Sequence, residues 1–110
     1  MVKPAPQRGD VWLVSLDPTL GAEIKKTRPC LVVSPPEIHD ALRTALVAPL
    51  TSKGFPAPFR IPVVFGCTSG LVLLDRIRTV DKLRLVKRLG PVQDGELQQV
   101  LEVLQELFAP

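Results

Sequence analysis

Short apolar segments, each ended by proline, glycine or aspartate, follow one another along this chain and restrict the folds open to it. Segments of this length and composition are typical of β-strands separated by turns. The expected strands cover residues 10–16, 29–33, 43–50, 59–64, 70–80 and 83–89. Residues 29–33 are apolar throughout, which predicts a central strand, whereas Pro62 lacks the N–H that a ladder requires and places 59–64 at an edge.

Turn-forming residues set the remaining boundaries. Residues 70–80 form either two strands that meet near Asp75 or one long bent strand. Residues 37–42 form a short helix or a turn, and Gly90-Pro91 is expected to end the strand 83–89.

The last segment has a different periodicity, which predicts an amphipathic α-helix over residues 96–108. Its apolar residues recur at spacings of three and four, namely Leu97, Val100, Leu101, Leu104, Leu107 and Phe108. Asp94 is the expected N-cap, and Glu96 lies favourably at the positive end of the helix dipole. Many short strands followed by one helix predict a mainly β fold, namely a small antiparallel barrel with a C-terminal helix.

Length and composition limit the class of protein. With 110 residues, the chain is expected to form a single domain over 1–110. No apolar run approaches the roughly 20 residues that span a bilayer, so no membrane partner is expected. The first ten residues lack the apolar core of a signal peptide, which favours a cytoplasmic protein. In that compartment we expect Cys30 and Cys67 to be buried free thiols rather than a disulfide or a metal pair.

Basic residues gather in two stretches of the chain. Fourteen Lys and Arg against eleven Asp and Glu give a net charge of +3. The first group comprises Lys25, Lys26 and Arg28, and the second comprises Arg76, Arg78, Lys82, Arg84, Lys87 and Arg88. This clustering favours a polyanionic partner such as RNA or DNA, although an ordinary solvated surface explains the composition equally well.

Several common catalytic designs are missing from the sequence. It has one histidine, His39, expected at the surface of a polar turn, and no P-loop, GxGxxG, HExxH or nucleophile elbow. Cys30 lies in a predicted core strand without a base beside it, which argues against a thiol enzyme. We therefore expect no metal and no cofactor. One reaction that remains open is RNA cleavage by the 2′-hydroxyl of the substrate, which needs positioning, charge stabilisation and modest proton transfer.

Arg28 stands where a polar loop meets the apolar strand 29–33. Pro29 restricts Arg28 to extended backbone geometry. A fixed, permanently charged guanidinium fork suits a phosphate better than it suits a core. If the strands 29–33 and 43–50 pair antiparallel, the start of one lies beside the end of the other, which places Arg28 near Thr51.

A hydroxyl pair and two carboxylates complete the set of candidates. Thr51 and Ser52 end one strand, Asp75 follows an apolar run, and Glu23 lies in the opening loop. Structural roles stay open for each position, because Thr51 and Ser52 could cap a loop and Asp75 could pair with a neighbouring arginine.

Four blocks of the sequence, taken in order, resemble the MazF/PemK family of toxin endoribonucleases. They are RGDVWLVSLDPT, GAEIKKTRPCLVVSP, VAPLTSKGFP and LLDRIRTVDKLRL, and the resemblance covers residues 8–108. It implies an SH3-like barrel related to the CcdB toxin fold, a homodimer, and metal-independent cleavage of single-stranded RNA at short sequences. It also implies a 2′,3′-cyclic phosphate product and neutralisation by a cognate antitoxin.

The same resemblance implies roles for individual positions. Arg28 matches the arginine of the family's RP motif, Thr51 matches its strand-end hydroxyl residue, and Glu23 matches an acidic residue of the first loop. Asp75 matches the aspartate that precedes the RT motif, whose arginine is Arg78. Arg28 is then expected to clamp the phosphorus, and Thr51 to donate a hydrogen bond to a phosphoryl oxygen. Asp75 or Glu23 is the candidate base for the 2′-hydroxyl.

Two positions depart from the pattern of PemK-type members. Those members have a histidine just before the loop glutamate, where this chain has Ala22, and an arginine two residues before the aspartate, where it has Leu73. The acid–base scheme of PemK-type members therefore does not transfer intact.

Further residues are expected to contact RNA, the single-stranded substrate. They are Lys25, Lys26, Thr27, Ser52, Lys53 and Arg78. Phe55 either stacks on a base or anchors its loop against the barrel, and Trp12 is expected in the core. A basic groove also predicts an acidic antitoxin segment that folds on binding.

Two other functions compete with RNA cleavage. A CcdB-like gyrase poison would act through an exposed C-terminal helix end, although the tail lacks the tryptophan that CcdB uses. A non-catalytic SH3-like nucleic-acid-binding module is compatible with Ala22 and Leu73.

Overall fold

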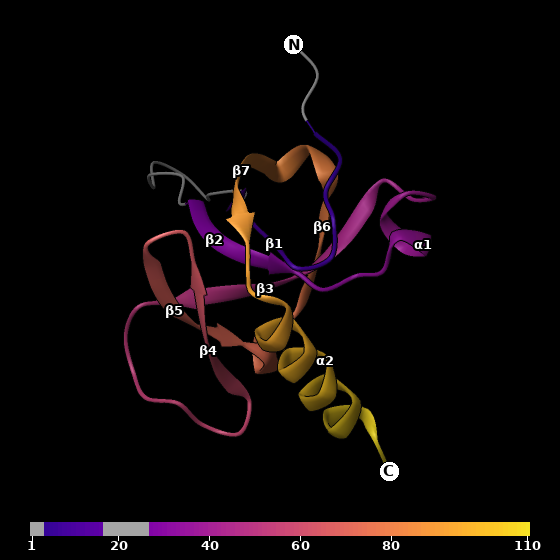
Figure 1. Ribbon diagram of the computed structural model, residues 1–110. Coiled ribbons are helices and arrows are strands. Elements are labelled where there is room, and N and C mark those ends of the chain that lie inside the picture. Colours follow the sequence, from indigo (N-terminus) through magenta and orange to yellow (C-terminus); the bar gives the residue numbers. More distant parts are fainter. Residues whose placement is uncertain (1–3, 17–26) are drawn as a thin grey trace, which may run out of the picture.

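The computed structural model of the protein describes residues 4–16 and 27–110, which form a curled β-sheet and a long C-terminal helix (Figure 1). The strands are β1 (Asp10–Ser15), β2 (Thr27–Val32), β3 (Thr44–Thr51), β4 (Arg60–Phe65), β5 (Thr68–Leu73), β6 (Arg78–Asp81) and β7 (Leu85–Pro91). The helices are α1 (Pro36–His39), α2 (Asp94–Phe108) and the 3-10 turns η1 (Leu74–Arg76) and η2 (Lys82–Arg84). The predicted mainly β fold with a C-terminal helix is confirmed.

All strand pairs are antiparallel, in the order β4-β5-β3-β2-β1-β7, and β6 also pairs with β3. The strand β2 is central, as its apolar sequence predicts. The strand β4 lies at one edge, as Pro62 predicts. The segment 70–80 is two strands, because η1 interrupts it at Asp75.

The central strands bury both of their faces. On β2, Leu31 belongs to one core cluster, while Cys30 and Val32 belong to another, because successive side chains of a strand point to opposite faces. Trp12 is 1% exposed in the second cluster, which confirms its predicted core position. The first cluster includes Val100 of α2, so the apolar stripe of the helix packs against the sheet.

The helix α2 begins differently from the expectation. Gln93 is its N-cap, so the prediction of Asp94 was wrong. Gln93 and Glu96 form a reciprocal capping box, in which Glu96 Oε1 accepts the backbone N–H of Gln93 at 3.3 Å. The Glu96 carboxylate also accepts the backbone N–H of Val64 at 3.0 and 3.1 Å, which ties the helix start to the edge strand β4. Figure 1 shows α2 beside β4.

Two further expectations were wrong. Gly90-Pro91 does not end the preceding strand but forms the last part of β7, and Gly90 takes the positive φ of 135° that only glycine adopts easily. His39 is 1% exposed rather than on the surface. Its Nδ1 hydrogen-bonds Ser34 Oγ at 3.1 Å, which satisfies a buried polar group that α1 turns inward.

Within residues 4–16 and 27–110, no helix is long and apolar enough to cross a membrane.

A buried carboxylate joins the first and last strands. The Asp10 side chain is 4% exposed, and its two oxygens accept hydrogen bonds from Arg88 Nε and Nη2, both at 3.0 Å. These bonds and the negative charge of Asp10 raise the pKa of Arg88. The paired geometry compensates for the burial of the Asp10 charge.

We expect Arg88→Gln to lower the free energy of unfolding by about 1–3 kcal/mol, because it leaves the Asp10 carboxylate buried without its cation. Denaturant unfolding followed by circular dichroism measures this change. Lys87→Gln, one residue away and exposed, removes the same charge and should change stability by less than about 0.5 kcal/mol. Equal stabilities of the two variants would contradict the role given to this ion pair.

Candidate active site

The pairing of β2 with β3 brings the beginning of one strand to the end of the other. Cys30 lies opposite Pro49 in this ladder. Arg28 and Thr51 each lie two residues further on, and side chains two residues apart share a face. Arg28 and Thr51 are therefore neighbours on one face of the sheet, as the sequence predicted, and both line the same two pockets.

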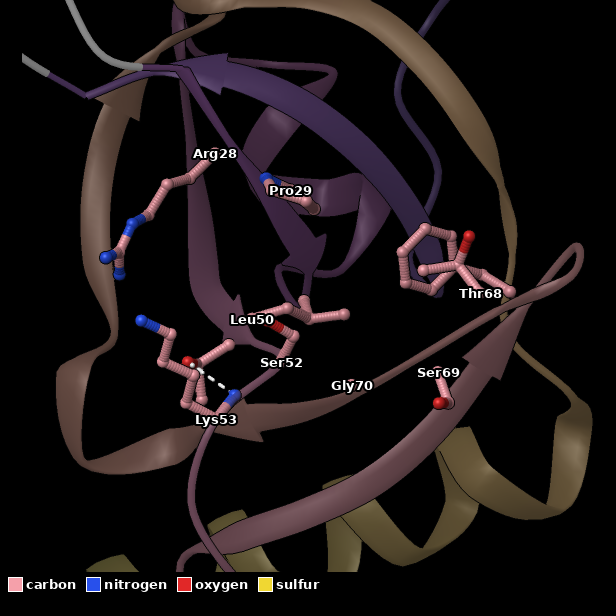
Figure 2. A pocket seen from close by; sticks show the side chains of 10 residues that line it. Arg28, Pro29, Leu50, Ser52, Lys53, Thr68, Ser69 and Gly70 are labelled. Atoms are coloured by element: carbon pink, nitrogen blue, oxygen red, sulfur yellow. Dashed lines mark hydrogen bonds between the residues drawn. The ribbon is translucent and has the colours of Figure 1, made fainter.

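The first of these, the strand-end pocket, has a volume of about 300 Å³. It is lined by Arg28, Pro29, Leu50, Thr51, Ser52, Lys53, Phe65, Thr68, Ser69 and Gly70. Figure 2 shows the side chains of Arg28 and Lys53 on one side of this pocket and those of Thr68 and Ser69 on the other. The two cationic side chains thus face the hydroxyl groups of Thr68 and Ser69 across the pocket.

Arg28 is exposed at the mouth of the pocket, while the rest of β2 becomes progressively buried. Within the described part of the chain, its guanidinium makes no hydrogen bond or ion pair. The five N–H donors of this guanidinium fork match the geometry of a phosphate.

A backbone contact fixes the hydroxyl group of Thr51. Its Oγ1 accepts a hydrogen bond from the backbone N–H of Lys53 at 3.2 Å, the dashed line in Figure 2. Because the oxygen already accepts this bond, the hydroxyl proton is free to donate to a ligand.

A second pocket, the cationic pocket, has a volume of about 330 Å³ and shares Arg28, Thr51 and Lys53 with the first. Its lining is Arg28, Thr51, Lys53, Gly54, Arg60, Leu73 and Arg76. Four of these side chains are cations and none is a carboxylate. The sum of their charges favours an anionic ligand.

Asp75 is not among the residues that line either pocket. Its Oδ2 lies 3.6 Å from Nη2 of Arg60, and the two side chains are 41% and 37% exposed. Among the described residues, Asp75 therefore pairs with Arg60 of the cationic pocket rather than with its sequence neighbours Arg76 or Arg78.

The described residues hold no group of three or more His, Cys, Asp or Glu side chains placed to share a metal ion.

Comparison with known proteins shows which family the chain belongs to. Residues 7–108 match the family described as PemK-like, MazF-like toxins of type II toxin–antitoxin systems. The chain belongs to this PemK/MazF family.

Individual relatives agree with the family match. The sequence is 42% identical over 108 residues to endoribonuclease PemK of Escherichia coli, covering 93% of this chain and 81% of that protein. It is 31% identical over 105 residues to endoribonuclease EndoA of Bacillus subtilis, covering 90% of each chain.

Solved structures show the same fold. MazF (Form-I) from Deinococcus radiodurans superposes with a TM-score of 0.78 at 28% identity, covering 96% of this chain and 97% of that one. A MazE–MazF structure (Form-I) from the same organism has a TM-score of 0.77 at 25% identity, with the same coverage.

The structure places the other residues predicted from the PemK/MazF resemblance as follows. Ser52 and Lys53 line the strand-end pocket, and Thr27 is exposed at the start of β2. Arg78 is exposed at the start of β6 and lines neither pocket, although its charge acts on the thiol of Cys30. The predicted positions Ala22, Glu23, Lys25 and Lys26 lie outside the described residues.

Sequence reasoning missed part of the pocket lining. Arg60 and Arg76 line the cationic pocket, and Thr68, Ser69 and Gly70 line the strand-end pocket. Arg76 belongs to the basic cluster noted in the sequence. No local pattern indicated Arg60 or residues 68–70, because only the strand pairing brings β4 and β5 to the site.

Gly70 permits the close approach of β5 to β3. A Cβ at this position would lie 3.2 Å from the backbone oxygen of Thr51. A larger residue would therefore push against the strand end that carries the hydroxyl.

The two thiols differ in their surroundings. Cys30 is buried as predicted, but Cys67 is exposed, so the prediction of two buried thiols was wrong. Burial raises the pKa of the Cys30 thiol to about 12, although the charges of Arg28 and Arg78 act in the opposite direction. Cys30 is therefore a protonated core residue beneath Arg28, and its Sγ donates to the Arg28 carbonyl at 3.6 Å.

We expect iodoacetamide at mildly alkaline pH to alkylate Cys67 and to leave Cys30 unmodified in the folded protein, because Cys67 is exposed whereas burial raises the pKa of Cys30 to about 12. Peptide mass spectrometry distinguishes the two sites, and the same treatment in denaturant should modify both. Modification of Cys30 at a rate similar to that of Cys67 in the folded state would contradict this assignment.

Proposed function

We propose that this protein is a toxin endoribonuclease that cleaves single-stranded RNA at specific sequences without a metal ion. The observation that carries the proposal is the placement of Arg28 beside Thr51 across the β2–β3 ladder, at the mouth of a cation-lined pocket. Membership of the PemK/MazF family and the names of the relatives support an RNA substrate.

The reaction that suits these groups uses a nucleophile within the RNA itself. The 2′-oxygen attacks the adjacent phosphorus, its proton passes to a base, and the bond from phosphorus to the 5′-oxygen breaks. The leaving 5′-oxygen takes up a proton, which gives a 2′,3′-cyclic phosphate and a 5′-hydroxyl end. The protein has to position the groups in line and stabilise the charge on the phosphoryl oxygens.

Arg28 supplies the charge stabilisation in this scheme. Its guanidinium stays protonated at neutral pH, so it acts as an electrostatic clamp rather than as an acid. Preorganised donors of this kind typically supply about 3–4 kcal/mol of transition-state stabilisation. Thr51 adds a hydroxyl donor to a phosphoryl oxygen, since its oxygen is oriented by the N–H of Lys53.

The base in the proposed reaction is a carboxylate. Asp75 is one candidate, and its pairing with Arg60 keeps it next to the cationic pocket. Glu23 of the first loop is the other candidate, by its position in the sequence.

Substrate binding is proposed to involve both polar and aromatic groups around the pockets. The proposed contacts are Lys25, Lys26, Thr27, Ser52, Lys53 and Arg78. Phe55 is 85% exposed, so it does not anchor its loop against the barrel, and its ring is available to stack on a base.

We also propose a homodimer that acts in the cytoplasm and is neutralised by an acidic antitoxin. The family description and the similarity to a MazE–MazF structure support an antitoxin partner. The net charge of +3 and the cation-lined pocket favour an acidic segment.

We expect Arg28→Ala to lower the single-turnover rate of RNA cleavage by about 10²–10³-fold, because the clamp on the phosphoryl oxygens is lost. Mapping of 5′-hydroxyl ends in a mixed RNA transcript measures the rate and the sites, and circular dichroism verifies folding. Arg43→Ala serves as the control, because Arg43 is an exposed arginine directly before β3, at the end of that strand opposite Thr51. Near wild-type cleavage by Arg28→Ala would refute the role of Arg28 as the phosphate clamp. RNA left intact by the wild-type protein, together with inhibition of gyrase supercoiling, would refute the proposed endoribonuclease function.

We expect EDTA to leave the cleavage rate unchanged, because the proposed reaction relies on Arg28, Thr51 and a carboxylate alone. The assay compares wild-type protein before and after dialysis against EDTA, with and without added Mg²⁺. A strict requirement for the metal would contradict the proposed mechanism.

A further inference from the structure

We propose that Arg60 of β4 is a second phosphate-binding arginine of the site, a role that rests on the proposed cleavage of RNA. Its side chain lines the cationic pocket together with Arg28 and Thr51. The RNA backbone carries one phosphate per nucleotide, so a strand held at Arg28 presents neighbouring phosphates to the cations around it.

The sheet register places Arg60 on the same face as the catalytic candidates. Thr51 lies opposite Leu71, and Arg60 lies opposite Leu73 two residues further along β5. Residues two apart on a strand share a face, so Arg60 projects to the side on which Thr51 lies. Leu73, which lies opposite Arg60 and lines the same pocket, is apolar, so Arg60 is the charged member of this cross-strand pair.

The ion pair of Arg60 leaves its guanidinium available. The separation of 3.6 Å from Asp75 exceeds hydrogen-bond length, and more than a third of each side chain is exposed to water. Exposed pairs of this kind are weak, because water screens both charges. The planar fork can therefore exchange this carboxylate for a phosphate.

Arg76 lines the same pocket and is the alternative source of this contact. It belongs to η1 and has no ion pair among the described residues, so nothing there orients it. Arg60 belongs to the strand β4, whose ladder with β5 fixes the direction in which its side chain leaves the backbone.

The test measures the binding of a fluorescein-labelled, fully 2′-O-methylated RNA of mixed sequence by fluorescence anisotropy, since this RNA offers no 2′-hydroxyl nucleophile. Arg60→Gln is compared with Arg43→Gln, which removes the same charge at the far end of β3. We expect Arg60→Gln to weaken binding by about three- to tenfold and to lower the salt slope by about 0.7, while Arg43→Gln binds like the wild type. Arg60→Lys, which keeps the charge without the fork, should recover part of the affinity.

The variant Asp75→Asn distinguishes a contact between Arg60 and phosphate from a purely structural role of the Arg60–Asp75 ion pair. It breaks the same pair but removes a negative charge, so the RNA should bind as well as, or better than, it binds the wild type. Equal weakening by Asp75→Asn and Arg60→Gln would overturn the proposal, and so would a loss in Arg76→Gln with none in Arg60→Gln. Binding of Arg60→Gln that matches Arg43→Gln would overturn it too.

Failure of this inference and failure of the proposed function give different results. If the wild type cuts RNA and Arg60→Gln binds RNA like Arg43→Gln, the Arg60 contact is refuted. The proposed function is then still supported. A wild type that binds the methylated RNA but cuts no unmodified RNA refutes the function, and the binding comparison still decides the Arg60 contact.

Discussion

The antiparallel pairing of β2 with β3 is the constraint on which the candidate site depends. The register that sets Cys30 opposite Pro49 also brings Arg28 to Thr51. The same two strands bury apolar side chains on both faces, so a register shift would displace the core as well as the site. The stability of the core and the geometry of the site therefore arise from the same hydrogen-bonded ladder.

Electrostatics around this ladder favour an anion at one place. Cations from four different elements or loops reach the cationic pocket, and no carboxylate lines it. The carboxylate at its border, Asp75, is held by Arg60. Asp10, by contrast, is neutralised by Arg88 at the start of β1, where the pair stabilises the sheet. Asp10 therefore stabilises the sheet without lining the cationic pocket.

The sequence predicted local structure well where periodicity or turn chemistry is strong. The apolar run after Arg28 became a central strand, Pro62 marked an edge, and the repeat of apolar residues near the C-terminus became α2. It failed on the burial of two individual side chains. His39 is buried, with its Nδ1 hydrogen-bonded to Ser34 Oγ, and Cys67 is exposed in the turn between β4 and β5 rather than buried in a core strand.

By itself, the sequence determined the strand-rich fold, the C-terminal helix, the family and the juxtaposition of Arg28 with Thr51, because these follow from local patterning and from one antiparallel ladder. Only the tertiary structure decided that Arg60 joins the site and that Asp75 stays outside the lining of both pockets. The physical reason is that β4 reaches β3 only through β5, and the curl of the sheet turns that edge toward the strand ends. No pattern within one segment encodes which side chains of a distant strand face the same pocket.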